Sequence, residues 1–109
     1  MAYYLVSALP RGDRMPELER QLAAGAFLPL EPFGEVITSS LRNARRKMNG
    51  TAIWEEEDYC SPPLRQERAA VLDRYFYQLQ AEPVRRGEGW RRISGLPALF
   101  PSLTRQEER

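Results

Sequence analysis

The sequence contains no histidine, one cysteine (Cys60) and one lysine (Lys47). Without histidine, the chain lacks the commonest general base, the usual partner of a serine or cysteine nucleophile and the commonest transition-metal ligand. With a single cysteine, it has neither a disulfide within the chain nor a CxxC zinc or redox motif. A lone thiol is typical of a reducing compartment. We therefore expect a cytoplasmic protein, and we assign it no cofactor and no metal site.

A long hydrophobic segment is also missing. The first apolar run, residues 2–9, is about eight residues long, which is too short for a membrane span or for a signal peptide with its flanks. Basic and acidic side chains nearly balance, 16 against 15, and the net charge of +1 gives no overall field that favours nucleic acid or a lipid surface. Membrane association and nucleic-acid binding are therefore not expected.

What the chain does contain is typical of one globular domain. It has 109 residues, of which 42% are hydrophobic and 28% charged, so it can bury enough surface to fold without disulfides. Every basic residue except Lys47 is an arginine. This bias is typical of GC-rich coding or of a thermostable background. It would also suit recognition of carboxylate or phosphate groups by planar guanidinium side chains.

Apolar spacing along the chain predicts a strand, a helix, two strands, a helix and a strand. The helices have apolar residues at three- and four-residue intervals, and the strands are runs rich in β-branched and aromatic residues. This order predicts an α+β fold of the ferredoxin-like βαββαβ type. In that fold an antiparallel sheet carries two helices on one face, and the first and third strands are central. The strands are expected at 2–9, within 35–48, at 51–60 and at 83–93, and the helices at 14–24 and 62–81.

The helix predicted at 62–81 has the clearest pattern in the chain. Ser61 is expected to cap it and Pro62 to occupy its first position, where the fixed φ of proline fits. Glu67 and its charged neighbours are assigned to the solvent-facing side. The buried stripe consists of Leu64, Val71, Leu72, Tyr75, Phe76 and Leu79.

The stretch 35–48 allows two interpretations. Residues 36–38 favour a strand, which a short helix would follow. Alternatively, Asn49-Gly50 is a strong hairpin signal that would lay the basic residues 42–47 along the acidic residues 55–58. The hairpin is the preferred interpretation, and its predicted pairs are Met48–Thr51, Arg46–Ile53, Arg45–Trp54 and Arg42–Glu57.

A single domain is assigned to residues 1–103. Residues 27–34 contain two prolines, which exclude an interior strand, so we expect an ordered crossover loop that could form a pocket wall. Residues 96–103 are too apolar to hang free and are expected to pack on this subunit or on another. The charged residues 104–109 are expected to be a frayed tail.

The acidic run 55–58 is the main candidate for chemistry. In a strand, Glu56 and Asp58 face one side while Glu55 and Glu57 face the other. One interpretation is a solvated strand end whose charge is balanced by residues 42–47. The other is a cleft in which two carboxylates of one parity, about 7 Å apart, meet arginines of the last strand and serve a hard cation or an acid–base pair. The candidate ligand-binding residues are Glu56, Asp58, Arg85, Arg86, Trp90 and Arg91, and no catalytic residue is assigned.

Two further signals are weaker. Cys60 precedes the predicted second helix, whose N-terminus would favour a thiolate, but the acids before it oppose one, so a structural cysteine is expected. Trp90 lies among arginines, and Tyr3, Tyr4 and Trp54 lie on predicted strands, as in RNA-binding sheets that stack bases on aromatic rings. The aromatic-glycine signature of that module is absent.

The opening strand, turn and helix resemble those of several small ferredoxin-like proteins, among them dimeric α+β-barrel enzymes and small CRISPR-associated endonucleases. The endonucleases have an aspartate at the end of the first strand, where this chain has Ser7-Ala8-Leu9. The absence of histidine excludes the histidine-dependent barrel enzymes. No family is therefore assigned.

These observations lead to one expectation and two alternatives. We expect a small accessory or ligand-binding domain that acts as a homodimer and contacts a protein partner or a small anionic ligand. The apolar stretch 96–103 and the glycine-interrupted last strand motivate the dimer. The alternatives are an enzyme that uses carboxylate and arginine groups, with or without a divalent cation, and an RNA-binding module.

Overall fold

Strand β1 (Ala2–Pro10) is the centre of the computed structural model, which describes residues 2–107. It pairs antiparallel with β3 (Ala52–Asp58) on one side and with β4 (Phe76–Val84) on the other. The short strand β2 (Arg45–Arg46) pairs antiparallel with β3, so the four-stranded sheet of the described residues has the order β2-β3-β1-β4. The prediction that the first and third strands are central is confirmed.

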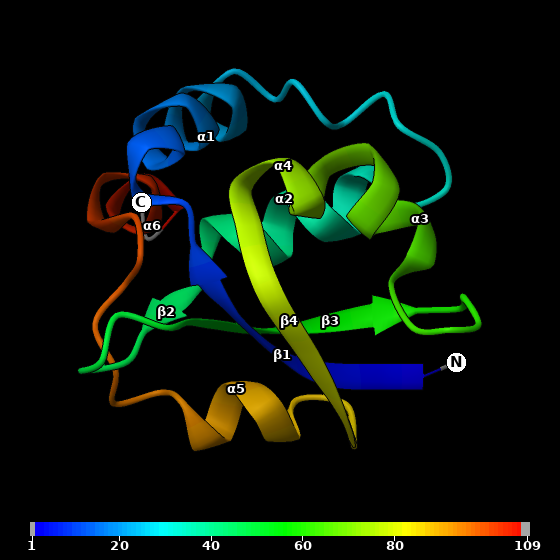
Figure 1. Ribbon diagram of the computed structural model, residues 1–109. Coiled ribbons are helices and arrows are strands. Elements are labelled where there is room, and N and C mark those ends of the chain that lie inside the picture. The colour runs from blue at the N-terminus through cyan, green and yellow to red at the C-terminus, as the bar shows by residue number, and fades with distance from the viewer. Residues whose placement is uncertain (1, 108–109) are drawn as a thin grey trace.

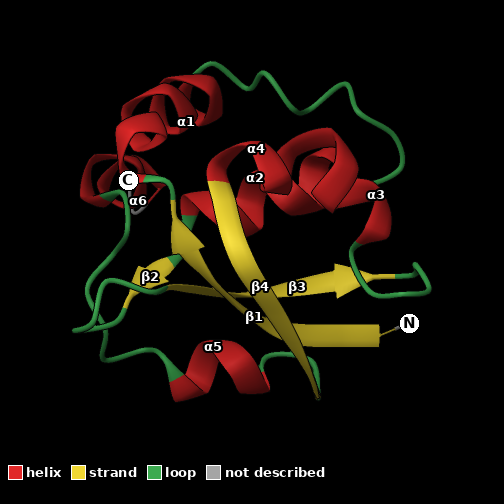
Figure 2. Ribbon diagram, viewed as in Figure 1, coloured by secondary structure: helices red, strands yellow, loops and turns green. Residues whose placement is uncertain are grey.

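Helices cover both faces of this sheet (Figures 1 and 2). One face carries the long crossover helices and the helical stretch that follows β3, whereas α5 lies against the opposite face. The prediction of helices on one face only is therefore incomplete. The helices are η1 (Gly12–Arg14), α1 (Met15–Ala23), α2 (Gly34–Arg42), α3 (Arg65–Glu67), the π-helical turn η2 (Arg68–Leu72), α4 (Asp73–Tyr75), α5 (Glu88–Arg92) and α6 (Pro101–Glu107).

The two faces of the sheet bury two apolar clusters. Alternation along β1 and β3 sends Val6 and Trp54 into the larger cluster under α1, α2 and the helical stretch 65–75. Leu5 and Ile53 point the other way and pack with Ile93 beneath α5. Each of these side chains contributes about 1.5–3 kcal/mol of gross burial energy, so the smaller cluster is enough to hold a five-residue helix that would not form alone.

The helix predicted at 62–81 is wrong at both ends. The chain enters helical conformation at Arg65 and leaves it after Tyr75, where β4 begins. A bulge in β4 explains the misleading spacing. The register against β1 shifts between Ser7 and Leu9, and Gln78 has a positive φ of 51°. This irregularity lets Phe76 and Leu79, three residues apart, pack into the same cluster, which imitates helical periodicity.

The stretch 35–48 combines parts of both interpretations. The strand predicted at 36–38 is wrong, because these residues lie in α2. The turn at Asn49-Gly50 does connect β2 to β3, with Gly50 at φ 91°, as the hairpin signal predicts. The pairing differs from the predicted register by one position, since Arg46 lies opposite Ala52 and Arg45 opposite Ile53.

The last predicted strand, 83–93, is also wrong. Only Val84 and the proline before it belong to β4, which lies at the edge of the sheet as a strand with a proline should. The chain then turns at Gly87, whose φ is 82°, and forms α5. Helix α1 begins and ends one residue inside its predicted bounds, and its N-cap residue, Arg14, makes no side-chain capping bond.

The C-terminal stretch packs on its own subunit. The N–H of Arg46 donates to the Pro97 carbonyl at 2.8 Å, and the N–H of Leu99 donates to the Ala44 carbonyl at 2.8 Å. Phe100 and Leu103 are buried in the larger cluster. Helix α6 continues to Glu107, so the tail predicted to fray is helical as far as that residue, and residues 108–109 lie outside the described part. None of the described helices combines the length and apolar character that crossing a membrane requires.

Candidate functional site

The acidic end of β3 is buried. Glu55, Glu56 and Asp58 are between 1% and 4% exposed, and only Glu57 is partly exposed. The interpretation of a solvated strand end is therefore wrong. The basic residues do not lie along it either, because β2 begins only at Arg45, opposite Ile53, and Arg42 belongs to α2. The buried acids must find their partners elsewhere.

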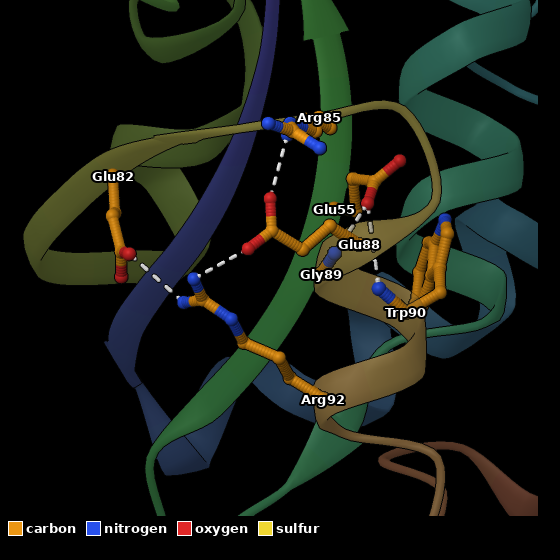
Figure 3. A network of polar contacts seen from close by, with 7 residues as sticks. All are labelled: Glu55, Glu82, Arg85, Glu88, Gly89, Trp90 and Arg92. Carbon is orange, nitrogen blue, oxygen red and sulfur yellow. Dashed lines mark hydrogen bonds and ion pairs between the residues drawn. The ribbon is translucent and has the colours of Figure 1, made fainter.

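Glu55 finds its partners in the backbone at the start of α5 (Figure 3). Its Oε2 accepts the N–H of Gly87 at 2.8 Å, and its Oε1 accepts the N–H groups of Gly89 at 2.8 Å and Trp90 at 3.4 Å. The first amides of a helix have no partner within the helix, and a carboxylate satisfies them with charge-assisted bonds. Glu55 therefore fixes α5 to the sheet, which explains why this stretch is not a strand.

An exposed ion-pair network surrounds the same turn (Figure 3). Arg92 contacts Glu82 at 2.8 Å and Glu88 at 2.7 Å, and the Glu88 carboxylate accepts the N–H of Arg85 at 2.9 Å. These bonds connect β4, the turn and α5. Because the side chains are exposed, each ion pair contributes little to stability, typically about 0.2–1 kcal/mol. The network orients the turn and is not itself a binding site.

A hollow of about 450 Å³ opens between α2 and the start of α5, beside β3. Three carboxylates and one guanidinium are the charged groups on its wall. The tyrosine hydroxyl of Tyr3 donates to Glu57 Oε2 at 3.2 Å, and that of Tyr59 donates to Glu57 Oε1. The lining residues are Tyr3, Glu35, Val36, Ser39, Ser40, Glu55, Glu57, Arg86, Gly87 and Trp90.

The hydrogen bonds to Glu57 perturb both tyrosines. Partial burial raises the pKa of Tyr3, and the bond to Glu57 raises it further. For Tyr59 the bond to Glu57 is the main cause of its raised pKa. Each phenol therefore stays protonated at neutral pH and acts as a donor to Glu57.

The hollow collects only some of the residues predicted for a site. Arg86 and Trp90 line it, together with the carboxylates of Glu55 and Glu57. Arg85 and Arg91 are exposed and do not line it. Glu56 and Asp58 occupy the even-numbered positions of β3, whereas Glu55 and Glu57 occupy the odd-numbered ones, so Glu56 and Asp58 face the opposite side of the sheet. Alternation along the strand identified the two pairs, but it could not tell which pair meets the arginines.

The opposite side of β3 holds a second group of acids. Glu56 lies beneath the helices, where its Oε1 accepts the indole N–H of Trp54 at 2.8 Å. Asp58 accepts the backbone N–H of Leu64 at 2.6 Å. Glu67 joins them from α3 and is 1% exposed, so its assignment to the solvent-facing side is wrong. Glu67 lies three residues after Leu64 and four before Val71, and this spacing places it on the buried side of the helical stretch.

Burial governs the protonation of this group. It raises the pKa of Glu56 to about 8 against the opposing bond from Trp54, and the charges of Glu67 and Asp58 add to the rise. Burial and a hydrogen bond to Asp58 raise the pKa of Glu67 to about 7. Burial would also raise the pKa of Asp58, but the bonds from Glu67 and the Leu64 amide outweigh it and lower the pKa. The hydrogen bond between the two carboxyl groups therefore favours the proton on Glu67 and the charge on Asp58.

Cys60 lies next to this group. Its Sγ and one oxygen each of Asp58 and Glu67 are within 4.8 Å of one another. The three residues also line a small cavity of about 40 Å³, walled by Pro32 and Phe33 of the crossover loop. The prediction that this loop forms a pocket wall is confirmed. Carboxylate oxygens and a thiolate are metal ligands, so this is where the described residues could hold a cation.

Comparison with family models, with curated protein sequences and with solved structures found no match. The hollow beside α5 and the acidic group of Glu56, Asp58 and Glu67 are therefore the features that bear on function.

Proposed function

We propose that this domain binds a small molecule that carries an amino or guanidino group, and that the ligand occupies the hollow between α2 and α5. The observation that carries the proposal is the charge of the wall, where Glu35, Glu55 and Glu57 stand against Arg86 alone. The hollow's volume, about 450 Å³, lies within the range of about 300–1,000 Å³ that is usual for small-molecule sites.

The individual groups suit a cation. Glu57 is held by two tyrosine hydroxyls, so its carboxylate is oriented before a ligand arrives. Trp90 and Tyr3 offer aromatic surface, which attracts a cation placed over the ring face. The hydroxyls of Ser39 and Ser40 on α2 add acceptors for N–H groups on the far wall.

The expected anionic ligand is less well supported than a cationic one. An anion in the hollow would have Arg86 as its one charged partner among the lining residues. It would meet three carboxylates, of which Glu55 is buried and therefore weakly screened. Charge repulsion by such a wall discriminates against an anion more strongly than a single guanidinium favours it.

The enzyme and RNA alternatives gain no support from these contacts. The Glu55 carboxylate already accepts hydrogen bonds from backbone amides. The other arginines of the predicted site point to solvent or to surface ion pairs. For RNA, the stacking platform is missing, because Trp54 is fully buried and α5 covers the other side of β3.

We also propose that the domain is a variant of the ferredoxin-like fold. The strand order and the antiparallel pairing of all neighbouring strands support it, as do the helices between β1 and β2 and between β3 and β4. The homodimer stays a prediction. Its first motive, the apolar stretch 96–103, is packed within the subunit. Its second motive, the glycine-interrupted last strand, is the end of the edge strand β4 followed by a turn and α5.

Isothermal titration calorimetry tests the proposed ligand class. We expect agmatine and putrescine to bind, and citrate and inorganic phosphate to give no heat. Glu57→Gln should weaken agmatine binding by about tenfold, equivalent to about 1.4 kcal/mol. Asp13→Asn removes the same charge from the exposed turn at the other end of β1 and serves as the control. Absence of heat with every amine, or equal losses in the two variants, would overturn the proposal.

A further inference from the structure

The chain after β3 brings three potential metal ligands together. Asp58 ends the strand, Cys60 follows two residues later, and the loop then returns so that Glu67 faces them from α3. Leu64 makes this return possible, because its left-handed backbone, φ 65°, directs its N–H onto Asp58 Oδ2. The backbone conformation of this loop therefore holds the three residues close together.

Two buried oxygens next to this group have no partner. Glu56 Oε2 and Glu67 Oε2 are inaccessible to solvent and accept no hydrogen bond from the described residues. Both side chains are 1% exposed. An unsatisfied buried oxygen costs roughly 1–3 kcal/mol, more if it is charged, so native structures rarely retain one without a ligand, ion or water.

The group also lacks a counter-charge. Among residues 2–107, no arginine or lysine forms an ion pair with Glu56, Asp58 or Glu67. Buried carboxylates are normally paired with a cation or bind a metal. A divalent cation at this point would supply the missing positive charge.

Space for an ion exists at this point. The cavity of about 40 Å³ is lined by Asp58, Cys60 and Glu67 on one side and by Pro32 and Phe33 on the other. A cavity of this kind needs roughly 10–15 Å³ to admit one water molecule, so this one has room for an ion or a water besides the side chains. Glu67, whose Oε2 is unpartnered, is part of this wall.

We propose that Asp58, Cys60 and Glu67 form a site for a thiophilic divalent cation of the Zn²⁺ type, with a water or small ligand as fourth donor. Bond lengths of about 2.0–2.3 Å to oxygen and sulfur place tetrahedral ligands roughly 3.3–3.8 Å apart. The three donor atoms already lie within 4.8 Å of one another, so small side-chain rotations complete the site.

The donor set selects the metal. A thiolate favours Zn²⁺ and Co²⁺ over Mg²⁺ and Ca²⁺, which prefer six or more oxygen ligands.

Titration of the purified protein with Co²⁺ and Zn²⁺ tests the site, and it is independent of the proposed amine ligand. We expect one Co²⁺ per chain, a thiolate-to-cobalt charge-transfer band in the near ultraviolet, and displacement of Co²⁺ by Zn²⁺. Cys60→Ser should abolish the band, and Glu67→Gln should weaken binding by at least about tenfold. Mg²⁺ and Ca²⁺ should not compete.

Matched variants make the outcome decisive. Asp13→Asn removes a carboxylate from the exposed turn after β1, which lines neither the hollow nor the small cavity, and should leave Co²⁺ affinity unchanged. Circular dichroism of each variant separates loss of a ligand from loss of the fold. The site is refuted if the folded protein binds no Co²⁺, if the charge-transfer band persists in Cys60→Ser, or if a folded Glu67→Gln variant binds as tightly as the parent chain.

Discussion

Glu55 shows how one side chain can determine a secondary structure. Its carboxylate accepts three backbone N–H groups at the start of α5, and it is 4% exposed. The neighbouring Glu57 has the same parity but is partly exposed and bonds to tyrosine hydroxyls. The two residues therefore offer a direct comparison between a structural and a ligand-facing carboxylate.

Replacing Glu55 should destabilise the fold more than replacing Glu57. Glu55→Ala leaves the amides of Gly87 and Gly89 buried without an acceptor, so we expect a loss of about 2–4 kcal/mol of unfolding free energy. Glu57→Ala should cost less than about 1 kcal/mol. Urea denaturation followed by circular dichroism measures both, and similar losses in the two variants would contradict the role given to Glu55.

Glu56 should make the metal-free protein less stable as the pH rises. Its pKa is raised from 4.5 to about 8 in the folded chain, so the unfolded chain loses this proton first. Between these two values the folded chain keeps a proton that the unfolded chain has lost. The unfolding free energy therefore falls through that window by about 1.4 kcal/mol per pH unit at most. Glu67, whose pKa is raised to about 7, acts in the same direction.

Glu56→Gln removes this titration while keeping the acceptor for Trp54. We expect the decline in stability between pH 5 and pH 8 to be shallower in the variant than in the parent chain. Urea unfolding at four pH values in the presence of a chelator gives the two slopes, with Asp13→Asn as the control. Equal slopes, or a parent chain that gains stability toward pH 8, would count against the buried carboxyl.

These residues also mark what the sequence could predict of a site. Alternation assigned Glu56 and Asp58 to one face and Glu55 and Glu57 to the other, and the structure agrees. Burial of the acids could not be predicted, because their partners are backbone amides of a distant turn and a residue of another helix. Glu67 was missed because its charge favours an assignment to solvent, although its spacing from Leu64 and Val71 is that of the buried stripe.

Among the secondary-structure elements, β4 is the one whose periodicity misleads. Its bulge changes the parity of the buried residues, so Leu72, Phe76 and Leu79 recur at helical intervals although a strand begins between them. Regular elements such as β1 and α1 were predicted within one or two residues. Helix α5 was missed because its formation depends on Glu55, which lies about thirty residues earlier.

The bulge predicts a stabilising substitution. Gln78 has a positive φ of 51°, a conformation that costs a side chain about 1 kcal/mol and glycine almost nothing. Gln78→Gly should therefore raise the unfolding free energy by about 0.5–1 kcal/mol. Gln80→Gly, at an exposed position of the same strand, should lower it by a similar amount. If Gln78→Gly destabilises the protein as much as Gln80→Gly does, the bulge geometry is wrong.

At the junction between the crossover loop and α2, a substitution of glycine should destabilise the fold. A Cβ at Gly34 would lie 2.4 Å from the Phe27 carbonyl oxygen and 2.5 Å from that of Leu28, and backbone atoms cannot easily give way. Gly34→Ala should cost about 2–4 kcal/mol. Gly12→Ala meets nothing within 4 Å and should be nearly neutral. Thermal unfolding of the two variants compares them, and a neutral Gly34→Ala would show that the loop packs differently.

For the domain as a whole, β3 borders both proposed sites. Glu55 and Glu57 line the hollow beside α5, and Asp58 lines the small cavity beneath the helices, whose wall Glu57 also reaches. The C-terminal stretch closes the end of the sheet by bonding to β2. One acidic strand can therefore serve a cationic small molecule on one side and a metal ion on the other.

The most direct test of the proposed function is a two-dimensional ¹H–¹⁵N NMR titration of the full chain with agmatine. We expect saturable chemical-shift changes for amides around the hollow, including those of Tyr3, Glu57, Gly87 and Trp90. We expect no change at Cys60 or Glu67. Shifts confined to the side of β3 beneath the helices, or no saturable shift anywhere in the spectrum, would contradict the proposed function.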